Sequence, residues 1–308
     1  MGIMIPIAHI RMTDFIFSDK KHGLTGEMLD VASFRLKQAG YTDAGSSVKQ
    51  LVFGICGSDM PFSGYLHVTE EELVELECGI SRMLNGEPVQ YITKIAPFWK
   101  YDFYIEPGVL IPRFDTETLV EAALKHIKDG QHVLDLCTGS GCIGLTIASE
   151  KNVILDAVDI SEISEKVFTV NAEKIPIKCK PVFHSGDVFD DVFCHKLSSS
   201  KFDIIVSNPP YINADDMNGL SEQVKAEPEI ALFGGEDGLD FYKRIIPLSA
   251  SLLKNGGHLF LEIGFDQGDS VRSLAEESGF ITEIIKDLSG NDRVIHGQYT
   301  AKDFFNDR

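Results

Sequence analysis

The sequence predicts an α/β protein in which a parallel sheet follows a smaller helical segment. From residue 131 onward, short apolar runs typical of strands alternate with amphipathic runs typical of helices, and this alternation indicates a parallel sheet. Before residue 82, apolar residues recur at spacings of three and four, which indicates helices. The chain has 308 residues, of which 44% are hydrophobic, and this length suits one large domain and one small one.

The amino-terminal part is expected to be helical. A first helix is expected within Phe15–Ala39, and Gly40 is a suitable stop for it. Thr69 precedes three glutamates and predicts a capped helix start, because its oxygen can accept a backbone N–H and acidic side chains favour a helix N-terminus. That helix is expected to end near Asn85-Gly86. Val89–Ile111 is rich in aromatic and β-branched residues and predicts a hairpin-like connector.

The domain boundary is expected within this connector, which gives a helical substrate-recognition domain at residues 1–93 and a sheet-containing domain at 94–308. Strands are expected in the second domain at residues 132–137, 153–159, 181–184, 202–207, 258–263, 280–288 and 293–299. Helices are expected at residues 142–150, 165–175, 238–253 and 269–278. Only residues 289–292 separate the last two strands. A turn this short cannot make a crossover, so we predict an antiparallel hairpin at the edge of the sheet.

Composition narrows the classes of function. The net charge of −19 comes from 28 basic and 47 acidic residues, and it disfavours nucleic acid as a partner because phosphates would be repelled. No apolar run approaches the length of a membrane span, and Met1–Ile16 lacks a signal-peptide pattern. None of the six cysteines forms a CxxC pair or has zinc-ligand spacing with a histidine. We therefore expect a cytoplasmic protein with reduced thiols and no metal site.

Asn208-Pro209-Pro210-Tyr211 is the most informative stretch. It follows a predicted buried strand, and its two prolines end strand pairing because they have no backbone N–H. The loop therefore lies at the carboxyl end of a strand, where open α/β sheets bind ligands. The Asn208 side chain and the Pro209 carbonyl offer acceptors for a planar NH2 group, and Tyr211 offers an aromatic face. This chemistry suits methylation of an amide or amino nitrogen.

A glycine-rich loop between the first predicted strand and its helix indicates a nucleotide-like ligand. Gly139, Gly141 and Gly144 match the GxGxxG pattern of dinucleotide-binding proteins, so an NAD-dependent oxidoreductase is one alternative. Asp135 disfavours it, because a carboxylate at this turn would repel a pyrophosphate, whereas it would suit a ligand that carries a sulfonium and an ammonium. Asp159 ends the second strand, where it can hold ribose hydroxyls.

The next turn adds a contact for a base. Gly186-Asp187 follows the third predicted strand, where the Asp187 carboxylate can accept from an adenine amino group and Val188 can pack on the ring. A non-catalytic protein that keeps a cofactor-binding fold is a further alternative, which the intact Asn208–Tyr211 stretch disfavours.

The chain resembles the HemK/PrmC-like family, the peptide chain release factor glutamine methyltransferases. The resemblance covers most of the chain, and the matching stretches occur in the right order. They are residues 87–92, 98–99, 110–117, 135–141, 159–161, 186–187, 206–212, 231–239, 262–264 and 290–293. Two positions depart from the family pattern: Phe114 replaces a proline after Arg113, and Lys94 replaces a glycine.

The resemblance implies a seven-stranded class I S-adenosylmethionine-dependent methyltransferase (Rossmann-like) domain preceded by a small helical bundle. The implied methyl donor is S-adenosyl-L-methionine, which leaves as S-adenosyl-L-homocysteine. The implied substrate is the glutamine of the Gly-Gly-Gln loop in peptide chain release factors, bound by a monomeric enzyme without nucleic acid or membrane. A nucleic-acid adenine or guanine N-methyltransferase is the alternative that shares the Asn-Pro-Pro-Tyr motif, and the acidic charge disfavours it.

The expected site residues fall into three groups. Catalysis is assigned to Asn208, Pro209, Pro210 and Tyr211. Donor binding is assigned to Asp135, Cys137, Thr138, Gly139, Ser140, Gly141, Asp159, Asp187, Val188 and Asn208. Substrate binding is assigned to Asn208, Pro209, Pro210, Tyr211, Arg113 and Glu117, although Arg113, Thr116 and Glu117 could instead cap the following helix. Glu262 ends the fifth strand, where it could support the site or take part in it.

Overall fold

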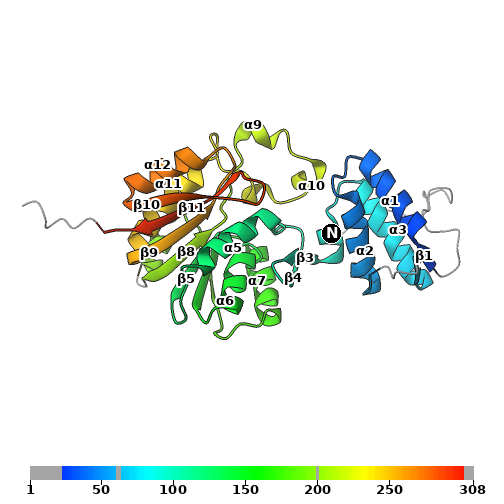
Figure 1. Cartoon of the computed structure of the whole chain (residues 1–308), viewed down its shortest axis with the longest axis horizontal. Coiled ribbons are helices and arrows are strands. Elements are labelled where there is room, and N and C mark those ends of the chain that lie inside the picture. Colours follow the sequence, from blue (N-terminus) through cyan, green and yellow to red (C-terminus); the bar gives the residue numbers. More distant parts are fainter. Residues whose placement is uncertain (1–22, 60–63, 199–200, 302–308) are drawn as a thin grey trace, which may run out of the picture. The chain divides into compact units, whose positions relative to one another are not determined.

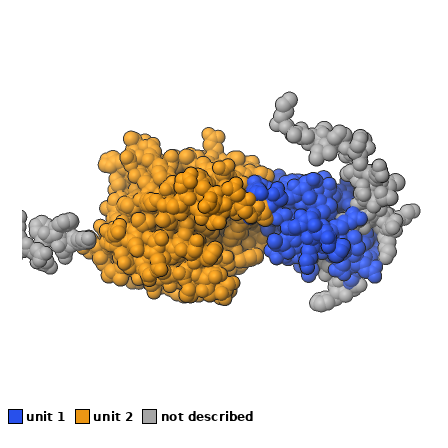
Figure 2. Space-filling view, turned by 90° about the horizontal axis from the view of Figure 1, so that it is seen from above, with its two compact units in different colours: residues 1–95, 222–226 blue, residues 96–221, 227–308 orange. Residues whose placement is uncertain are grey.

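A computed structural model describes residues 23–59, 64–198 and 201–301 of the chain. It divides into two compact units (Figure 2). The first comprises residues 1–95 together with 222–226, and the second comprises residues 96–221 and 227–308. Residues 15–22 of the first expected helix, and the Met1–Ile16 segment, lie outside the described residues.

The first unit is helical, as the apolar spacing predicts. Its core is formed by Leu36, Leu51, Leu76 and Ile80, which are all buried. Its main elements are α1 (Gly26–Gln38), α2 (Ala44–Cys56), α3 (Glu70–Leu84), α4 (Val89–Thr93) and α10 (Glu222–Lys225). A short antiparallel pair, β1 (Gly23–Thr25) and β2 (Tyr65–His67), accompanies the helices and has no clear signal in the sequence.

The predicted cap of α3 is present. Glu72 N donates to Thr69 Oγ1 at 3.1 Å, and Thr69 N donates to Glu72 Oε2 at 2.6 Å, so each residue satisfies a backbone donor of the other. The connector differs from the expected hairpin at its beginning, where α4 forms instead. Val89 N donates to the Tyr41 hydroxyl at 2.9 Å, and this tertiary contact helps to anchor the helix start. The hairpin follows as β3 (Ile95–Phe98) and β4 (Tyr101–Tyr104).

Lys94 ends α4 in the left-handed conformation, with φ of 58° and ψ of 27°. This conformation explains the glycine that the family pattern has here, because it costs a residue with a Cβ roughly 1–2 kcal/mol.

Lys94→Gly is expected to raise the free energy of unfolding by about 0.5–1 kcal/mol, since the greater freedom of glycine in the unfolded chain offsets part of the gain. Urea unfolding measures this change. Lys37→Gly within α1 is the control and is expected to destabilise by about 1 kcal/mol; equal destabilisation by both variants would contradict the argument.

The second unit contains a seven-stranded sheet with the order β10-β11-β9-β8-β5-β6-β7 (Figure 1). Strands β5 to β9 run parallel, whereas β11 pairs antiparallel with β9 and with β10. The predicted edge hairpin is therefore confirmed. The strands are β5 (His132–Leu136), β6 (Ile154–Asp159), β7 (Val182–Ser185), β8 (Phe202–Ser207), β9 (Leu253–Glu262), β10 (Phe280–Lys286) and β11 (Asp292–Tyr299).

Helices cover both faces of this sheet and give it two cores. On one face, buried residues of α5, α6 and α7 pack against the strands; on the other, buried residues of α8, α11 and α12 do so. The helices are α5 (Glu117–Leu124), α6 (Cys142–Glu150), α7 (Glu162–Lys174), α8 (Asp191–Leu197), α9 (Ala214–Met217), α11 (Asp240–Leu252) and α12 (Gly268–Glu277), with 3-10 turns at Phe114–Thr116 and Glu229–Ala231. In the described part of the chain, no helix combines the length and apolarity that crossing a membrane requires.

Two boundaries in the second unit differ from the predicted ones by three residues or more, each for an identifiable reason. Helix α7 begins at Glu162, three residues early, because the Ser161 hydroxyl caps it by accepting from Ser164 N at 3.3 Å. Strand β9 begins at Leu253, directly after α11, because a register shift against β8 accommodates the glycines before His258.

The order of the strands positions the site. The chain moves from β5 outward through β6 to β7, and then returns to the other side of β5 as β8. The order therefore reverses between β5 and β8. In open α/β sheets, ligands bind at the carboxyl ends of the strands beside such a reversal.

Candidate active site

A cavity of about 270 Å³ lies at the carboxyl ends of the central strands. Each of four neighbouring strands contributes a residue at or just after its end: Cys137 from β5, Asp159 from β6, Asp187 from β7 and Asn208 from β8. The convergence follows from parallel pairing, which places these ends along one edge of the sheet. The predicted residues Gly139, Val188 and Pro210 also line the cavity.

The glycine-rich loop between β5 and α6 forms one wall. Cys137, Gly139 and Gly141 all have positive φ, of 57°, 55° and 80°. Thr138 N donates to Val158 O at 3.0 Å, which fixes the loop against β6. Burial raises the pKa of the Cys137 thiol, so it stays protonated and is unsuited to act as a nucleophile.

Asp135 lies beneath this loop and is fully buried. Its Oδ2 accepts from Thr138 Oγ1 at 2.6 Å and from Gly144 N at 3.0 Å, whereas Oδ1 has no hydrogen-bond partner among the described residues. A side chain on Gly144 would meet Asp135 Oδ2 at 2.8 Å, so this glycine permits the close approach. Burial raises the pKa of the Asp135 carboxyl to about 7. Asp135 therefore holds the loop in place and is not among the residues that line the cavity, and a role in donor binding stays a prediction.

Two carboxylates border the cavity. Asp159 Oδ2 accepts from Gly139 N at 2.8 Å, and Oδ1 accepts from Ser161 N at 3.0 Å. Burial raises the pKa of Asp159. Asp187 Oδ1 accepts from Phe189 N at 2.8 Å. A carboxylate has about four acceptor positions, so both groups retain capacity for ligand hydroxyl or amino hydrogens.

Apolar side chains complete the part of the cavity beside Asp187. Val188 and Phe189 follow it directly, and the Phe189 ring meets Phe241 edge-to-face with 5.1 Å between the centroids. A flat heteroaromatic base can pack against such a wall while its amino group faces a carboxylate.

The amide of Asn208 has a defined neighbour. Its Nδ2 donates to Thr116 Oγ1 at 3.3 Å. Because the Thr116 hydroxyl donates to Glu262, the threonine oxygen is left to accept, and this sets the orientation of the amide. The carbonyl oxygen Oδ1 is then the atom that can accept from a ligand. Thr116 is buried at the start of α5 and belongs to the family-matching stretch 110–117, so this stretch holds the Asn208 side chain.

The loop after Asn208 is fixed by a second segment. Ile212 N donates to Leu232 O, and Gly234 N donates to Ile212 O, both at 2.9 Å. A Cβ on Gly234 would lie 2.6 Å from the Tyr211 Cα, so only glycine fits this approach. The Ala231–Leu239 stretch thus braces the Asn-Pro-Pro-Tyr loop, and Ala231 itself lines the cavity.

Tyr211 and Glu262 form a pair behind the loop. The Tyr211 hydroxyl donates to Glu262 Oε1 at 3.4 Å, and burial raises the pKa of this phenol. Glu262 is buried at the end of β9, and burial raises the pKa of its carboxyl to about 7, although the Thr116 hydroxyl and the Arg293 charge oppose the shift. Glu262 therefore contacts the motif from behind and supports it.

Arg113 and Glu117 have local partners. The Arg113 guanidinium pairs with the buried carboxylate of Glu227, which also accepts from Ile111 N at 2.9 Å. Glu117 Oε1 accepts at 2.6 Å from the backbone N of Trp99, a residue whose own φ is 58°. These contacts fix the loop before α5 and the β3–β4 turn. Neither residue lines the cavity, and a role in substrate binding stays a prediction.

Sequence patterns also missed several residues of the cavity. Three other residues predicted to bind the methyl donor lie in the glycine-rich loop but do not line the cavity: Thr138, Ser140 and Gly141. Likewise, Pro209 and Tyr211 lie in the Asn-Pro-Pro-Tyr loop but do not line the cavity. Lining residues that no pattern assigned are Gly108, Val109, Leu110, Val158, Ile160, Ser161, Ser164, Gly186, Phe189, Ile230, Ala231 and Phe241. Five of these residues belong to stretches that match the family, and this match could have identified them as site residues. They are Leu110, Ile160, Ser161, Gly186 and Ala231.

Comparisons with known proteins assign the family. Residues 102–226 match the family model of the methyltransferase small domain, and residues 27–93 match that of the PrmC N-terminal domain. The release factor glutamine methyltransferase of Clostridium acetobutylicum is 44% identical over 213 residues, which are 68% of this chain and 74% of that protein. The chain belongs to the release factor glutamine methyltransferase family. The family member from Aliivibrio fischeri is 39% identical over 244 residues, which are 76% of this chain and 82% of that protein.

A solved structure of the family is also similar. The crystal structure of the release factor-specific protein-(glutamine-N5) methyltransferase from Alicyclobacillus acidocaldarius is 33% identical. The match covers 65% of this chain and 100% of that one, with a TM-score of 0.39.

Membership makes the protein a methyltransferase of class I fold with S-adenosylmethionine as methyl donor. The cavity fits this donor by its own chemistry. Asp159 offers acceptors for ribose hydroxyls, Asp187 offers one for the adenine amino group, and Val188 with Phe189 and Phe241 offers an apolar surface for the ring.

Proposed function

We propose that this protein methylates the side-chain amide nitrogen of the glutamine in the Gly-Gly-Gln loop of peptide chain release factors. One observation carries the proposal: Asn208, with its amide orientation set by Thr116, lies in the wall of the cavity that suits S-adenosylmethionine. A group that can hold an amide is thereby next to the methyl donor. The family to which the chain belongs supports the choice of substrate.

The chemical problem is that an amide nitrogen is a poor nucleophile, because its lone pair is delocalised into the carbonyl group. S-adenosylmethionine supplies an electrophilic methyl group when bound. Asn208 Oδ1 and the Pro209 carbonyl accept the two hydrogens of the glutamine amide, which directs the nitrogen lone pair and stabilises the positive charge that develops there. Orientation of this kind can contribute up to about 7–11 kcal/mol to catalysis.

The remaining residues of the motif keep this arrangement rigid. Tyr211 packs on the plane of the substrate amide and is held by Glu262. Pro210 closes the cavity wall and cannot donate a competing backbone N–H. The methylated amide nitrogen loses its extra proton readily to water, so the site needs no strong base.

We further propose that the protein acts as a monomer in the cytoplasm and recognises the release factor without nucleic acid. The net charge of −19 supports the last point, since an acidic surface gains nothing from phosphate groups. Recognition by the helical first unit, matched to the PrmC N-terminal domain, is part of the same proposal.

The test uses radiolabelled S-adenosylmethionine with a purified release factor, either wild-type or with the loop glutamine replaced by alanine. Label on the wild-type factor alone is the expected result. Label on neither factor, but on added DNA or ribosomal RNA, would move the function to nucleic-acid N-methylation. Label on both factors would place the modified residue outside the Gly-Gly-Gln loop.

A further inference from the structure

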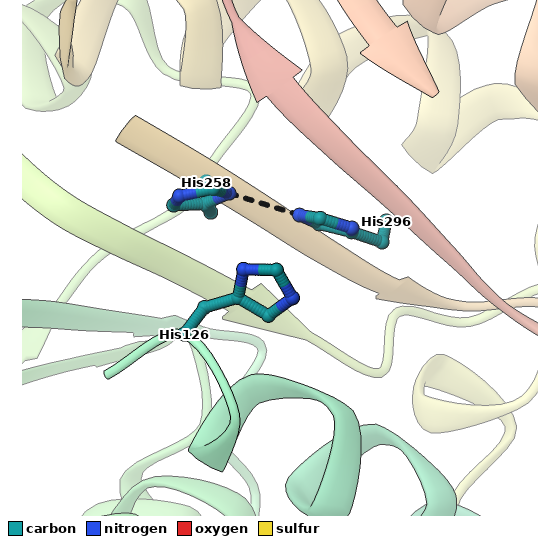
Figure 3. A group of neighbouring side chains, drawn as sticks. All are labelled: His126, His258 and His296. Carbon is teal, nitrogen blue, oxygen red and sulfur yellow. Dashed lines mark hydrogen bonds between the residues drawn. The ribbon is translucent and has the colours of Figure 1, made fainter. Parts of the chain in front are cut away.

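Three imidazoles from separate elements of the second unit converge on one another (Figure 3). His258 lies on β9, His296 lies on the neighbouring β11, and His126 follows α5. One ring nitrogen of each lies within 4.8 Å of those of the other two. The ring centroids are 4.4 Å apart for His126 and His296, 4.8 Å for His126 and His258, and 5.1 Å for His258 and His296.

The hydrogen bonds of His296 show which of its ring nitrogens carries the proton. Its Nδ1 bonds to Glu283 Oε1 at 2.7 Å. A carboxylate can only accept, so the proton lies on Nδ1, and the Nε2 of the neutral ring carries a lone pair. That nitrogen points at His258 Nδ1, 2.9 Å away, along the dashed line of Figure 3. A carboxylate that fixes the tautomer of a histidine in this way is the usual outer partner of a metal-binding imidazole.

The surroundings keep the His296 ring in place. His296 is buried and stacks on Phe260, with 4.5 Å between centroids and 5° between planes. Neutral imidazoles offer the lone pairs that a transition metal requires.

We propose that His126, His258 and His296 bind a Zn²⁺ ion, with water as the fourth ligand. Three nitrogen donors of borderline softness suit zinc, and Glu283 holds the His296 ring from outside the coordination sphere. The proposal departs from the sequence-based expectation of no metal site. That expectation considered only short ligand spacings, whereas these histidines come from three distant segments.

Binding requires side-chain adjustment and a change of tautomer at His258. Without metal, His258 Nδ1 donates its proton to His296 Nε2, and this proton must move to Nε2 of His258 before Nδ1 can bind the ion. Zinc–nitrogen bonds of about 2.0–2.1 Å in a tetrahedron place the nitrogens about 3.3 Å apart. The His258–His296 pair must therefore open slightly from 2.9 Å, and the widest pair must close from at most 4.8 Å. His126 and His258 are only partly buried, so their rings have room to turn and the ion has a path to the site.

The site lies away from the methyl-transfer cavity. His258 is in register with Ile204 of β8, four residues before Asn208, which corresponds to about 13 Å along the sheet. None of the three histidines lines the cavity. The ion would tie the segment after α5 to β9 and β11.

The experiment uses full-length protein without a histidine tag, dialysed free of metal. Equilibrium dialysis against Zn²⁺ followed by metal analysis is expected to give one equivalent of tightly bound zinc. Zinc is also expected to raise the thermal unfolding midpoint in a concentration-dependent way, because it binds only the folded site. Co²⁺, used as a spectroscopic probe, is expected to show the visible absorption of a tetrahedral site.

Matched variants locate the ion. His126→Gln and His258→Gln are expected to weaken zinc binding more than tenfold and to remove the cobalt absorption. Glu283→Gln is expected to weaken it about 10–100-fold. His195→Gln changes an exposed histidine outside the cluster and is expected to bind zinc as the wild type does. Circular dichroism establishes whether each variant is folded. If His258→Gln does not fold, His126→Gln tests the proposal by itself, because residue 126 lies outside the helices and strands.

Two results would overturn the proposal. One is wild-type protein that binds no zinc at micromolar concentrations. The other is zinc binding that persists unchanged in folded His126→Gln, because the ion would then be held elsewhere, for example by the exposed thiols of Cys78 and Cys179.

Discussion

Asn208→Ala is expected to lower methyl transfer to a release factor by at least about 10²–10³-fold, the range found when a single charge-stabilising group is removed from an active site. The affinity for S-adenosylmethionine is expected to change less than about threefold. Alanine removes the acceptor Oδ1, whereas Asp159, Asp187 and the apolar wall beside them remain in place. The loss should appear in kcat, because the contact is proposed to act on the charge that develops on the nitrogen.

Single-turnover kinetics with labelled donor, together with calorimetric donor binding, measure the two quantities separately. Asn218→Ala is the control, since this exposed asparagine lies ten residues downstream and its side chain donates to Ala214 O, within its own short helix. It is expected to leave both quantities unchanged. A large loss of donor affinity with normal single-turnover rate at saturation would show that Asn208 holds the donor and does not orient the amide.

The sheet was predictable because its signals are local. Apolar runs marked the strands, and β8 and α6 have the predicted bounds. The two prolines after Asn208 ended β8 where expected, because they remove donors from the ladder whatever the tertiary surroundings. The edge hairpin followed from the short turn between β10 and β11.

The cavity was predictable only at its strand ends. Cys137, Asp159, Asp187 and Asn208 were found because parallel strands bring their carboxyl ends together. Their partners come from distant segments with no local signal. Thr116, which orients Asn208, lies 92 residues before it in the sequence.

Roles were harder to predict than positions. Arg113 was expected to bind substrate, and that role stays a prediction; its pairing with Glu227, 114 residues away, had no signal in the sequence. A sequence shows that a charged residue is present but not which opposite charge lies beside it. Asp135 is a similar case, because its predicted contact with the donor stays untested, while its hydrogen bonds to Thr138 and Gly144 had no signal in the sequence.

Asp135→Asn is expected to make the protein more stable above pH 7 and to change its pH dependence. In the native protein this carboxyl is fully buried, and burial raises its pKa to about 7. A native pKa above the unfolded one means that folding favours the protonated form. The stabilising contribution is thus fully present below about pH 4 and is lost as the pH rises to about 7. Glu262, whose pKa is also raised to about 7, acts in the same direction.

Asparagine keeps the size of the side chain and carries no charge at any pH. Its oxygen can accept from Thr138 Oγ1 and Gly144 N, as Asp135 Oδ2 does, and its NH2 group then takes the place of the partnerless Oδ1. We expect the variant to be close to the wild type at pH 4 and more stable than it by about 1–3 kcal/mol at pH 8, the cost of a poorly satisfied buried group. Because Glu262 is still present, the free energy of unfolding of the variant should also fall as the pH rises, but less steeply than that of the wild type.

Urea unfolding at unit intervals from pH 4 to 8 measures this difference. Asp102→Asn changes an exposed aspartate on β4 and is expected to show no comparable rise with pH. A variant less stable than the wild type at every pH would mean that the bonds from Thr138 and Gly144 favour the carboxylate more strongly than burial opposes it. The affinity of the variant for S-adenosylmethionine tests whether Asp135 also contacts the donor. If Asp135 only holds the loop, the variant binds S-adenosylmethionine within about threefold of the wild type. A direct bond to the ammonium group of the donor would be charge-assisted and worth about 1.5–3 kcal/mol, so its removal would weaken binding more than tenfold.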